Sequence, residues 1–179
     1  MSASPAGTAQ EAARAAPRPT LIQALLVLVA VAIGIGGYIA LSTVLALRES
    51  YIGFIFVFYW LSVEHGKPQR LPAIILGSCF GLATSWLLQY AVHADHGAAW
   101  LALFLAIVAL AIVCLVLGRL SLVVNAPAML VLTVFTIPHI QRGADFARLY
   151  QALAFAAGYF AVFVGGLTWL AARRLPRKS

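Results

Sequence analysis

Residues 21–47 read LIQALLVLVAVAIGIGGYIALSTVLAL, a run without a charged side chain. A helix needs about 20 apolar residues to cross a bilayer, because the hydrocarbon core is about 30 Å thick and each residue adds about 1.5 Å. The run exceeds that length, and it is too long for the apolar region of a secretory signal, which has about 7–15 residues. We therefore expect a retained transmembrane helix here.

Five more apolar runs follow, separated by short polar gaps. The second, residues 51–63, is short and aromatic, and the others cover 71–92, 98–117, 120–137 and 149–172. These runs are continuous and rich in Leu and Ala, whereas the strands of a membrane barrel alternate apolar and polar residues. The sequence therefore predicts an all-α polytopic membrane protein with six transmembrane helices within residues 21–172.

The composition supports a membrane protein. Of the 179 residues, 63% are hydrophobic and 9% are charged, whereas soluble domains carry about 25% charged residues. The net charge of +7 does not indicate nucleic acid, because the basic residues flank apolar runs and form no stripe. The expected partner is the lipid bilayer. Residues 1–20 are expected to form a disordered cytoplasmic tail and residues 173–179 a basic cytoplasmic tail.

The twelve Lys and Arg residues lie in the gaps and tails and are shared unevenly between the two sides of a six-helix chain. One side holds nine of them, Arg14, Arg18, Lys67, Arg70, Arg119, Arg173, Arg174, Arg177 and Lys178. The other side holds three, Arg48, Arg142 and Arg148. Basic residues favour the cytoplasmic side, so both ends are expected inside. A five-span alternative with a re-entrant second run would place the basic C-terminus outside.

Small residues recur at helical spacing. Gly77, Gly81 and Ser85 stand four apart and therefore share one helix face, and Gly158 and Gly165 lie in the last run. Small residues let helix backbones approach closely, which predicts helix packing at these glycines. A pore lined by glycine backbone is the alternative.

Polar residues inside the third and fifth runs are candidates for a substrate pathway. Asn125 and Pro127 interrupt the fifth run, and Thr133 follows them, while Thr84 and Ser85 lie in the third. Interrupted helices supply substrate sites in many transporters. The alternatives are a proline kink near the helix start, and hydroxyls that bond to their own helix. Gln89 is expected to reach the membrane interface.

No motif in the sequence indicates catalysis. His93, Asp95 and His96 are suitable metal-ligand types, but they lie in a gap with no third histidine or cysteine nearby, so a solvated loop is expected and no metal or cofactor is predicted. The sequence contains no nucleophile–base pair and no nucleotide motif, and no acidic residue lies within an apolar run. We therefore expect a protein that is not an enzyme.

A weak internal repeat links the third and sixth runs. Arg70 precedes LPAIILGSCFGLATSWL and Arg148 precedes LYQALAFAAGYFAVFVGGLTWL, and both stretches carry paired glycines and end in Ser/Thr-Trp-Leu. A three-helix unit repeated in tandem has inverted topology, a plan that recurs in transporters.

Several short stretches together resemble a known group of membrane proteins. They are residues 37–42 (GYIALS), 51–54 (YIGF), 120–127 (LSLVVNAP) and 168–173 (TWLAAR). They resemble the YcdZ-like small bacterial inner-membrane proteins, a family of unknown function. A basic gap before a glycine-rich helix is more distantly similar to the membrane half of fusaric-acid-resistance and aromatic-acid exporters. The resemblance implies a bacterial cytoplasmic membrane and a six-helix fold. In place of that family's Pro-Gly step the chain has Asn125-Ala126-Pro127.

These features favour a small transporter or channel, working as a homo-oligomer, for an uncharged or anionic solute such as an aromatic or other organic anion. An anion arriving from outside would first meet Arg142 and Arg148, which share the longest exterior gap. The alternative is a non-transporting assembly factor or a subunit of a larger membrane complex, because the apolar runs contain no charge.

Overall fold

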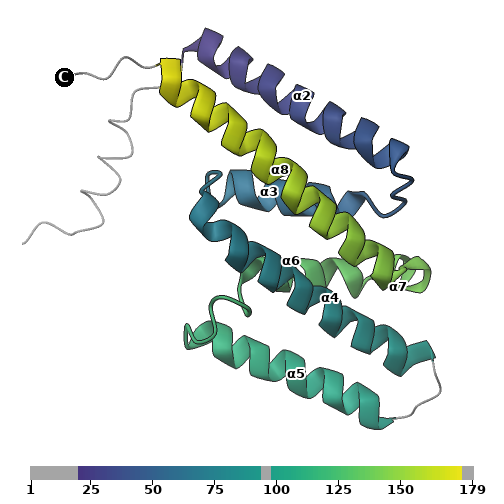
Figure 1. Cartoon of the computed structure of the whole chain (residues 1–179). Helices are drawn as coiled ribbons and strands as arrows, with labels where there is room; N and C mark the ends of the chain where they lie inside the picture. The colour runs from purple at the N-terminus through teal and green to yellow at the C-terminus, as the bar shows by residue number, and fades with distance from the viewer. Residues whose placement is uncertain (1–19, 94–97, 175–179) are drawn as a thin grey trace, which may run out of the picture. The chain divides into compact units, whose positions relative to one another are not determined.

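The structure, a computed structural model, describes residues 20–93 and 98–174 (Figure 1). The elements are α2 (Leu21–Val44), α3 (Tyr51–Ser62), the short 3-10 helix η1 (Pro68–Arg70), α4 (Leu71–His93), α5 (Ala98–Val116), α6 (Ala126–Phe135), α7 (Pro138–Gly143) and α8 (Phe146–Arg174). No strand occurs among these residues, so the all-α prediction is confirmed. Most of both predicted tails lies outside the described residues.

Among the described residues, four helices are long and apolar enough to cross a membrane. They contain the segments Leu25–Val44, Pro68–Val92, Ala98–Val116 and Phe146–Leu170. The second and fifth runs form shorter apolar helices, α3 with 12 residues and α6 with 10 residues. At helical rise these measure about 18 Å and about 15 Å, which is less than the hydrocarbon thickness.

The fifth run does not form one helix, contrary to the prediction, because its first residues make a turn. Gly118 has φ +64° and closes α5, with Gly118 N–H donating to Leu115 O at 3.2 Å and Arg119 N–H to Cys114 O at 2.8 Å. This is the Schellman arrangement that ends many helices. Leu120 follows at φ +55°, and the chain resumes a helix only after Asn125.

The C-terminal end of α2 has the same geometry. Ala46 has φ +53°, Ala46 N–H donates to Thr43 O at 3.1 Å, and Leu47 N–H donates to Ser42 O at 2.9 Å. The long helices α2 and α5, which precede α3 and α6, therefore both end in a Schellman motif.

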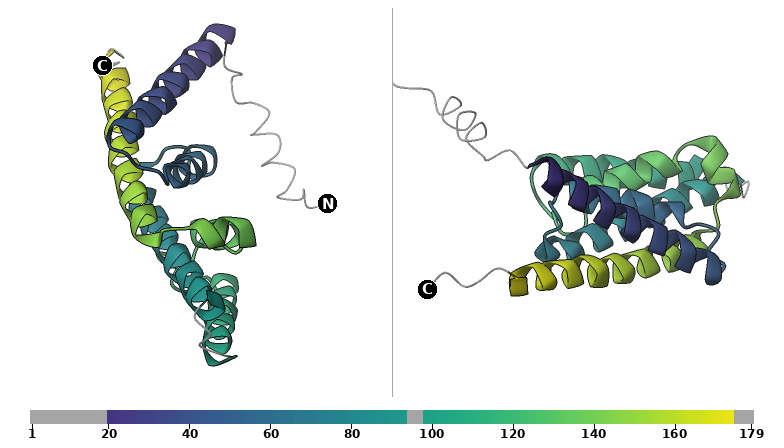
Figure 2. Two further views of the ribbon diagram at one scale, coloured as in Figure 1. Left: turned by 90° about the vertical axis from the view of Figure 1, so that its right-hand side faces the viewer. Right: turned by 90° about the horizontal axis from the view of Figure 1, so that it is seen from above.

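The chain divides into two units, Met1–Gly37 and Tyr38–Ser179, with the boundary inside α2. In the first unit, the large apolar side chains from Leu21 to Val29 are exposed where they are described. In the second, α5, α4 and α8 follow one another side by side, with α6 packed on α4 and α3 on α8 (Figures 1 and 2). The short helices α3 and α6 lie on the same face of these longer helices (Figure 2).

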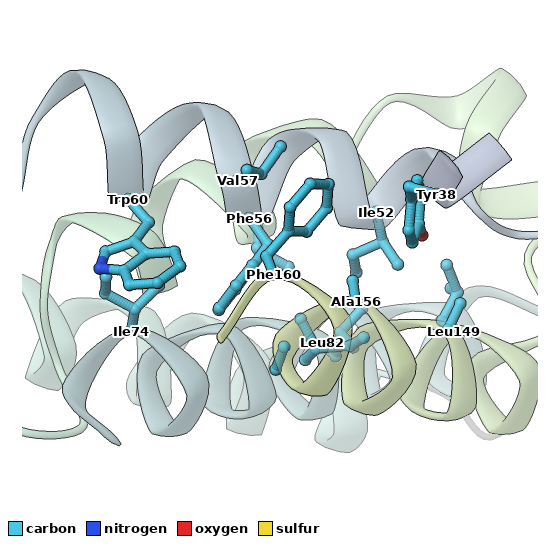
Figure 3. Packing of buried hydrophobic residues seen from close by; sticks show 14 of the residues in the cluster. Tyr38, Ile52, Phe56, Val57, Trp60, Ile74, Leu82, Leu149, Ala156 and Phe160 are labelled. Atoms are coloured by element: carbon cyan, nitrogen blue, oxygen red, sulfur yellow. The ribbon is translucent and has the colours of Figure 1, made fainter. Parts of the chain in front are cut away.

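The apolar core of the second unit gathers around α3 and α8. Ile52, Phe56 and Trp60 on α3 are buried with Ala156 and Phe160 on α8 (Figure 3). The indole N–H of Trp60 donates to Lys67 O at 3.0 Å. A buried indole donor needs such a partner, and this bond ties the end of α3 to the turn that follows it.

Tyr38 completes this core. Its side chain is 0% exposed, and its ring packs on Phe155 and Phe160 with ring centroids 5.8 Å and 5.1 Å away. The hydroxyl donates to Ser50 O at 2.8 Å, just before α3 begins. The ring lies over Gly53, where an added Cβ would collide with the tyrosine hydroxyl.

We expect Tyr38→Phe to lower the free energy of unfolding by about 1 kcal/mol, because it removes one buried hydrogen bond and keeps the ring. Unfolding of the purified protein by SDS in mixed micelles measures the change. Phe58→Tyr, which adds a hydroxyl to a side chain that is 69% exposed, is the control and should have little effect. Equal stability of Tyr38→Phe and the unmodified protein would mean that the Ser50 bond does not stabilise the fold.

Candidate functional site

The small-residue face of α4 is covered by α6. Gly77 and Gly81 are buried, and a Cβ on Gly81 would lie 2.6 Å from Ala128 O and 3.0 Å from Val131 Cβ. A Cβ on Gly77 would collide with the amide of Asn125. Both glycines therefore allow the close approach of α6. Because α6 occupies this face, the glycine backbone lines no pore in this structure.

Asn125 joins three segments of the chain. Its Oδ1 accepts a hydrogen bond from Ala128 N–H at 3.1 Å, which caps the N-terminus of α6. Its Nδ2 donates to Ala73 O on α4 at 2.7 Å. The same Nδ2 lies 3.3 Å from both Ser121 O and Leu122 O in the preceding turn. The side chain fixes where α6 begins and how it sits on α4.

Pro127 starts a helix and does not kink one. It is buried in the first turn of α6, where the amide hydrogen that proline lacks would have no partner within the helix. The proline kink considered from the sequence is absent because the helix begins only at Ala126.

The three hydroxyls of the predicted pathway bond to their own helices. Thr84 Oγ1 donates to Phe80 O at 2.9 Å, Ser85 Oγ to Gly81 O at 2.8 Å, and Thr133 Oγ1 to Met129 O at 2.7 Å. Such bonds satisfy a hydroxyl in an apolar setting. Thr84 and Ser85 are buried, whereas Thr133 is exposed on α6. Of the five predicted pathway residues, Asn125 and Pro127 lie together at the start of α6.

The glycines of α8 differ from those of α4. No heavy atom of the described residues lies within 4 Å of a Cβ placed on Gly158 or Gly165, and both residues are exposed. Packing at these two positions, which the sequence suggested, is not provided by the described residues of the second unit.

Gln89 holds α7 against α4, a role that the sequence did not indicate. Its Nε2 donates to Gln141 O at 2.7 Å and to Ala144 O at 3.2 Å. These carbonyls lie at the end of the short helix α7, and Gln141 O also accepts from Ala144 N–H at 3.3 Å. Gln89 caps α7 through these two bonds, and its predicted position at the membrane interface stays a prediction. The sequence does not reveal this cap, because the two carbonyls belong to residues that lie 52 and 55 positions after Gln89.

We expect Gln89→Leu to lower the free energy of unfolding by about 1–2 kcal/mol, because two partly buried carbonyls lose their side-chain donor. Gln151→Leu is the matched control, since Gln151 is exposed on α8, and its effect should stay within about 0.5 kcal/mol. Both variants are measured by SDS unfolding. A loss as large for Gln151→Leu as for Gln89→Leu would contradict the capping role.

The two arginines that the sequence predicts to be exterior, Arg142 and Arg148, have different surroundings. Arg148 is exposed, and its Nε lies 3.1 Å from Asp145 Oδ2. Asp145 also caps α8, accepting from Ala147 N–H at 3.1 Å and Arg148 N–H at 3.3 Å. Arg142 is exposed at the end of α7 and makes no ion pair with a described residue. The Arg148 guanidinium is therefore paired with a carboxylate, whereas Arg142 is paired with none of the described carboxylates.

Within the described ranges, no group of three His, Cys, Asp or Glu side chains could hold a metal ion. Asp95 and His96 lie outside the described residues, and His93 is the last residue of α4. Comparison with known protein families, curated proteins and solved structures finds no match. The account of function below therefore depends on the helices and contacts of this chain.

Proposed function

We propose that the chain is a six-pass transporter or channel for small organic anions, built from two inverted three-helix halves and working as a homo-oligomer in a bacterial cytoplasmic membrane. The observation that carries the proposal is a repeated order of elements: long helix, short helix, proline-led turn, long helix. The first half is α2, α3, η1 and α4, and the second is α5, α6, α7 and α8. η1 begins at Pro68 and α7 at Pro138, and both contain a Gln-Arg pair.

The packing of the second unit supports two related halves. The short helix α3 packs on α8, and the short helix α6 packs on α4, so each half places its short helix on the last long helix of the other. α3, α4, α5, α6 and α8 run in alternating directions (Figure 1). Inverted repeats that meet at the membrane midplane are a common plan of secondary transporters.

The basic residues favour six passes over four. If α3 and α6 were re-entrant and only the four long helices crossed, Lys67, Arg70 and Arg119 would join the three exterior basic residues. Each side would then hold six of the twelve Lys and Arg residues. The six-pass arrangement places nine inside and three outside, in accord with the positive-inside rule.

Asn125 is the polar group that a passing solute would use. It lies where the second half meets the first, with its amide shared between α6 and Ala73 of α4. A movement that separates α4 from α6 would free its Nδ2 donor, and a carboxylate is a strong acceptor for such a donor. The path would open between the halves, with Arg142 at its outer end.

Uptake into proteoliposomes tests this function. The purified protein is reconstituted, and accumulation of a panel of aromatic and aliphatic carboxylates is compared with empty liposomes. We expect faster uptake of at least one aromatic acid and no acceleration in vesicles that hold the unfolded protein. If no member of the panel enters faster than into empty liposomes, the transport proposal loses its support.

The second candidate function is a non-transporting subunit or assembly factor. It is favoured by Thr84, Ser85 and Thr133, whose hydroxyls all bond within their own helices. Purification from membranes in mild detergent separates the two functions. Stoichiometric recovery of a different membrane protein favours the subunit, and a homo-oligomer alone favours the transporter.

A further inference from the structure

α3 is bounded by acidic residues that are too close together for a bilayer of ordinary thickness. Glu49 precedes the helix and Glu64 follows it. At helical rise the 15 steps from Glu49 to Glu64 span about 22 Å, whereas the hydrocarbon core measures about 30 Å. If α3 crosses the membrane, at least one of these acidic residues lies within the thickness of an unperturbed hydrocarbon core.

The contacts of the turn after α3 identify that end. A Cβ on Gly66 would lie 3.7 Å from Val164 Cγ1, so this turn is level with Val164 of α8. α8 continues past Val164 to Trp169 and Arg173, whose guanidinium carbon lies 3.6 Å from the Trp169 ring centroid. Trp and Arg mark the membrane interface, and Arg173 is about 14 Å farther along the helix than Val164.

This recessed turn is charged. Arg70 Nε lies 3.4 Å from Glu64 Oε2, and their side chains are 63% and 24% exposed. Lys67 between them is also exposed. Charged side chains are costly in hydrocarbon and need water or lipid headgroups around them. The alternative is that the end of α8 projects into water. This would be costly, because Leu167 and Leu170 on its last turns are 40% and 49% exposed and would then face water.

We infer that the bilayer is thinned over the exposed side of α3, with phospholipid headgroups drawn in to Lys67 and Arg70. The partner is phospholipid, whose phosphate complements the two basic side chains. Phe58 and Val63, which are 69% and 53% exposed, would contact the shortened acyl chains. Thinning costs only a fraction of a kcal/mol per Å of mismatch, so a short helix can impose it. The inference relies on the proposed crossing of α3 and is independent of transport.

Two fluorescent depth probes test the inference. In a Cys79→Ser, Cys114→Ser background, Val63→Cys and Leu170→Cys are each labelled with an environment-sensitive dye and reconstituted at low protein density. Quenching is compared between lipids with a nitroxide near the headgroup and lipids with a nitroxide near the chain end. We expect both dyes to be quenched by about twofold more with the shallow nitroxide, because thinning brings headgroups to both levels.

Two other results would overturn the inference. Stronger quenching at position 63 by the deep nitroxide would mean that the turn lies in a flat bilayer. Shallow quenching at position 63 with a water-exposed dye at position 170 would mean that α8 projects from the membrane. The depth of the two dyes does not depend on transport. A protein that transports nothing but has both dyes at headgroup depth would contradict the proposed transport and still support the thinning.

Discussion

Gly77→Val lowers the free energy of unfolding by about 2–3 kcal/mol, because a side chain must be forced into a filled contact. A Cβ at Gly77 meets the amide of Asn125, and that amide is held in place by Ala128 N–H and Ala73 O. The new side chain therefore either pushes α6 away from α4 or breaks the cap of α6. SDS unfolding of the purified variant measures the loss.

Gly158→Val is the matched control for this substitution. Gly158 lies in a long apolar helix as Gly77 does, but no heavy atom of the described residues outside its own stretch of helix is within 4 Å of its Cβ position. Its effect should stay within about 0.5 kcal/mol, as for surface substitutions. Equal losses for the two variants would show that the cost lies in the helix itself and not in the α4–α6 contact.

Asn125→Asp is expected to cost about 2–4 kcal/mol, because a charged oxygen replaces a donor in a half-buried setting. The carboxylate still accepts from Ala128 N–H, but its second oxygen faces Ala73 O, where Nδ2 now donates at 2.7 Å. Two acceptors then oppose each other between α4 and α6.

Asn125→Ser separates the cap from the bond to α4. Serine caps helices well but is too short to reach Ala73 O, so a smaller loss of about 1 kcal/mol is expected. The stability order is therefore unmodified protein, then Asn125→Ser, then Asn125→Asp, again by SDS unfolding. A serine variant less stable than the aspartate variant would mean that the charge is well solvated and that α6 is not held by this bond.

The sequence predicted the parts of the fold that depend on periodic composition. Long uncharged runs became α2, α4, α5 and α8, and glycines four apart in the third run lie on one buried face of α4. The fifth run was misjudged because residues 120–124 are as apolar as a helix interior. Its break is set by positive φ at Gly118 and Leu120 and by the cap at Asn125, which hydropathy does not reveal.

The candidate site was predicted only in part, because its contacts join distant residues. Asn125 stood out as a polar residue in an apolar run, but its partner Ala73 is 52 positions away. Gly158 and Gly77 both lie in long apolar runs, yet only Gly77 has a contact from outside its own helix. Gln89 likewise shows its role only through the carbonyls of α7.

Labelling of single cysteines from one side of the membrane tests the six-pass arrangement most directly. In the cysteine-free background, single cysteines are placed at four exposed positions, one before and one after each of α3 and α6: Arg48→Cys, His65→Cys, Ser121→Cys and His139→Cys. Two inverted halves predict that an impermeant maleimide added outside intact cells labels positions 48 and 139 and reaches positions 65 and 121 only after the membrane is opened. Labelling of all four positions in intact cells would show that α3 and α6 do not cross, and would contradict the account.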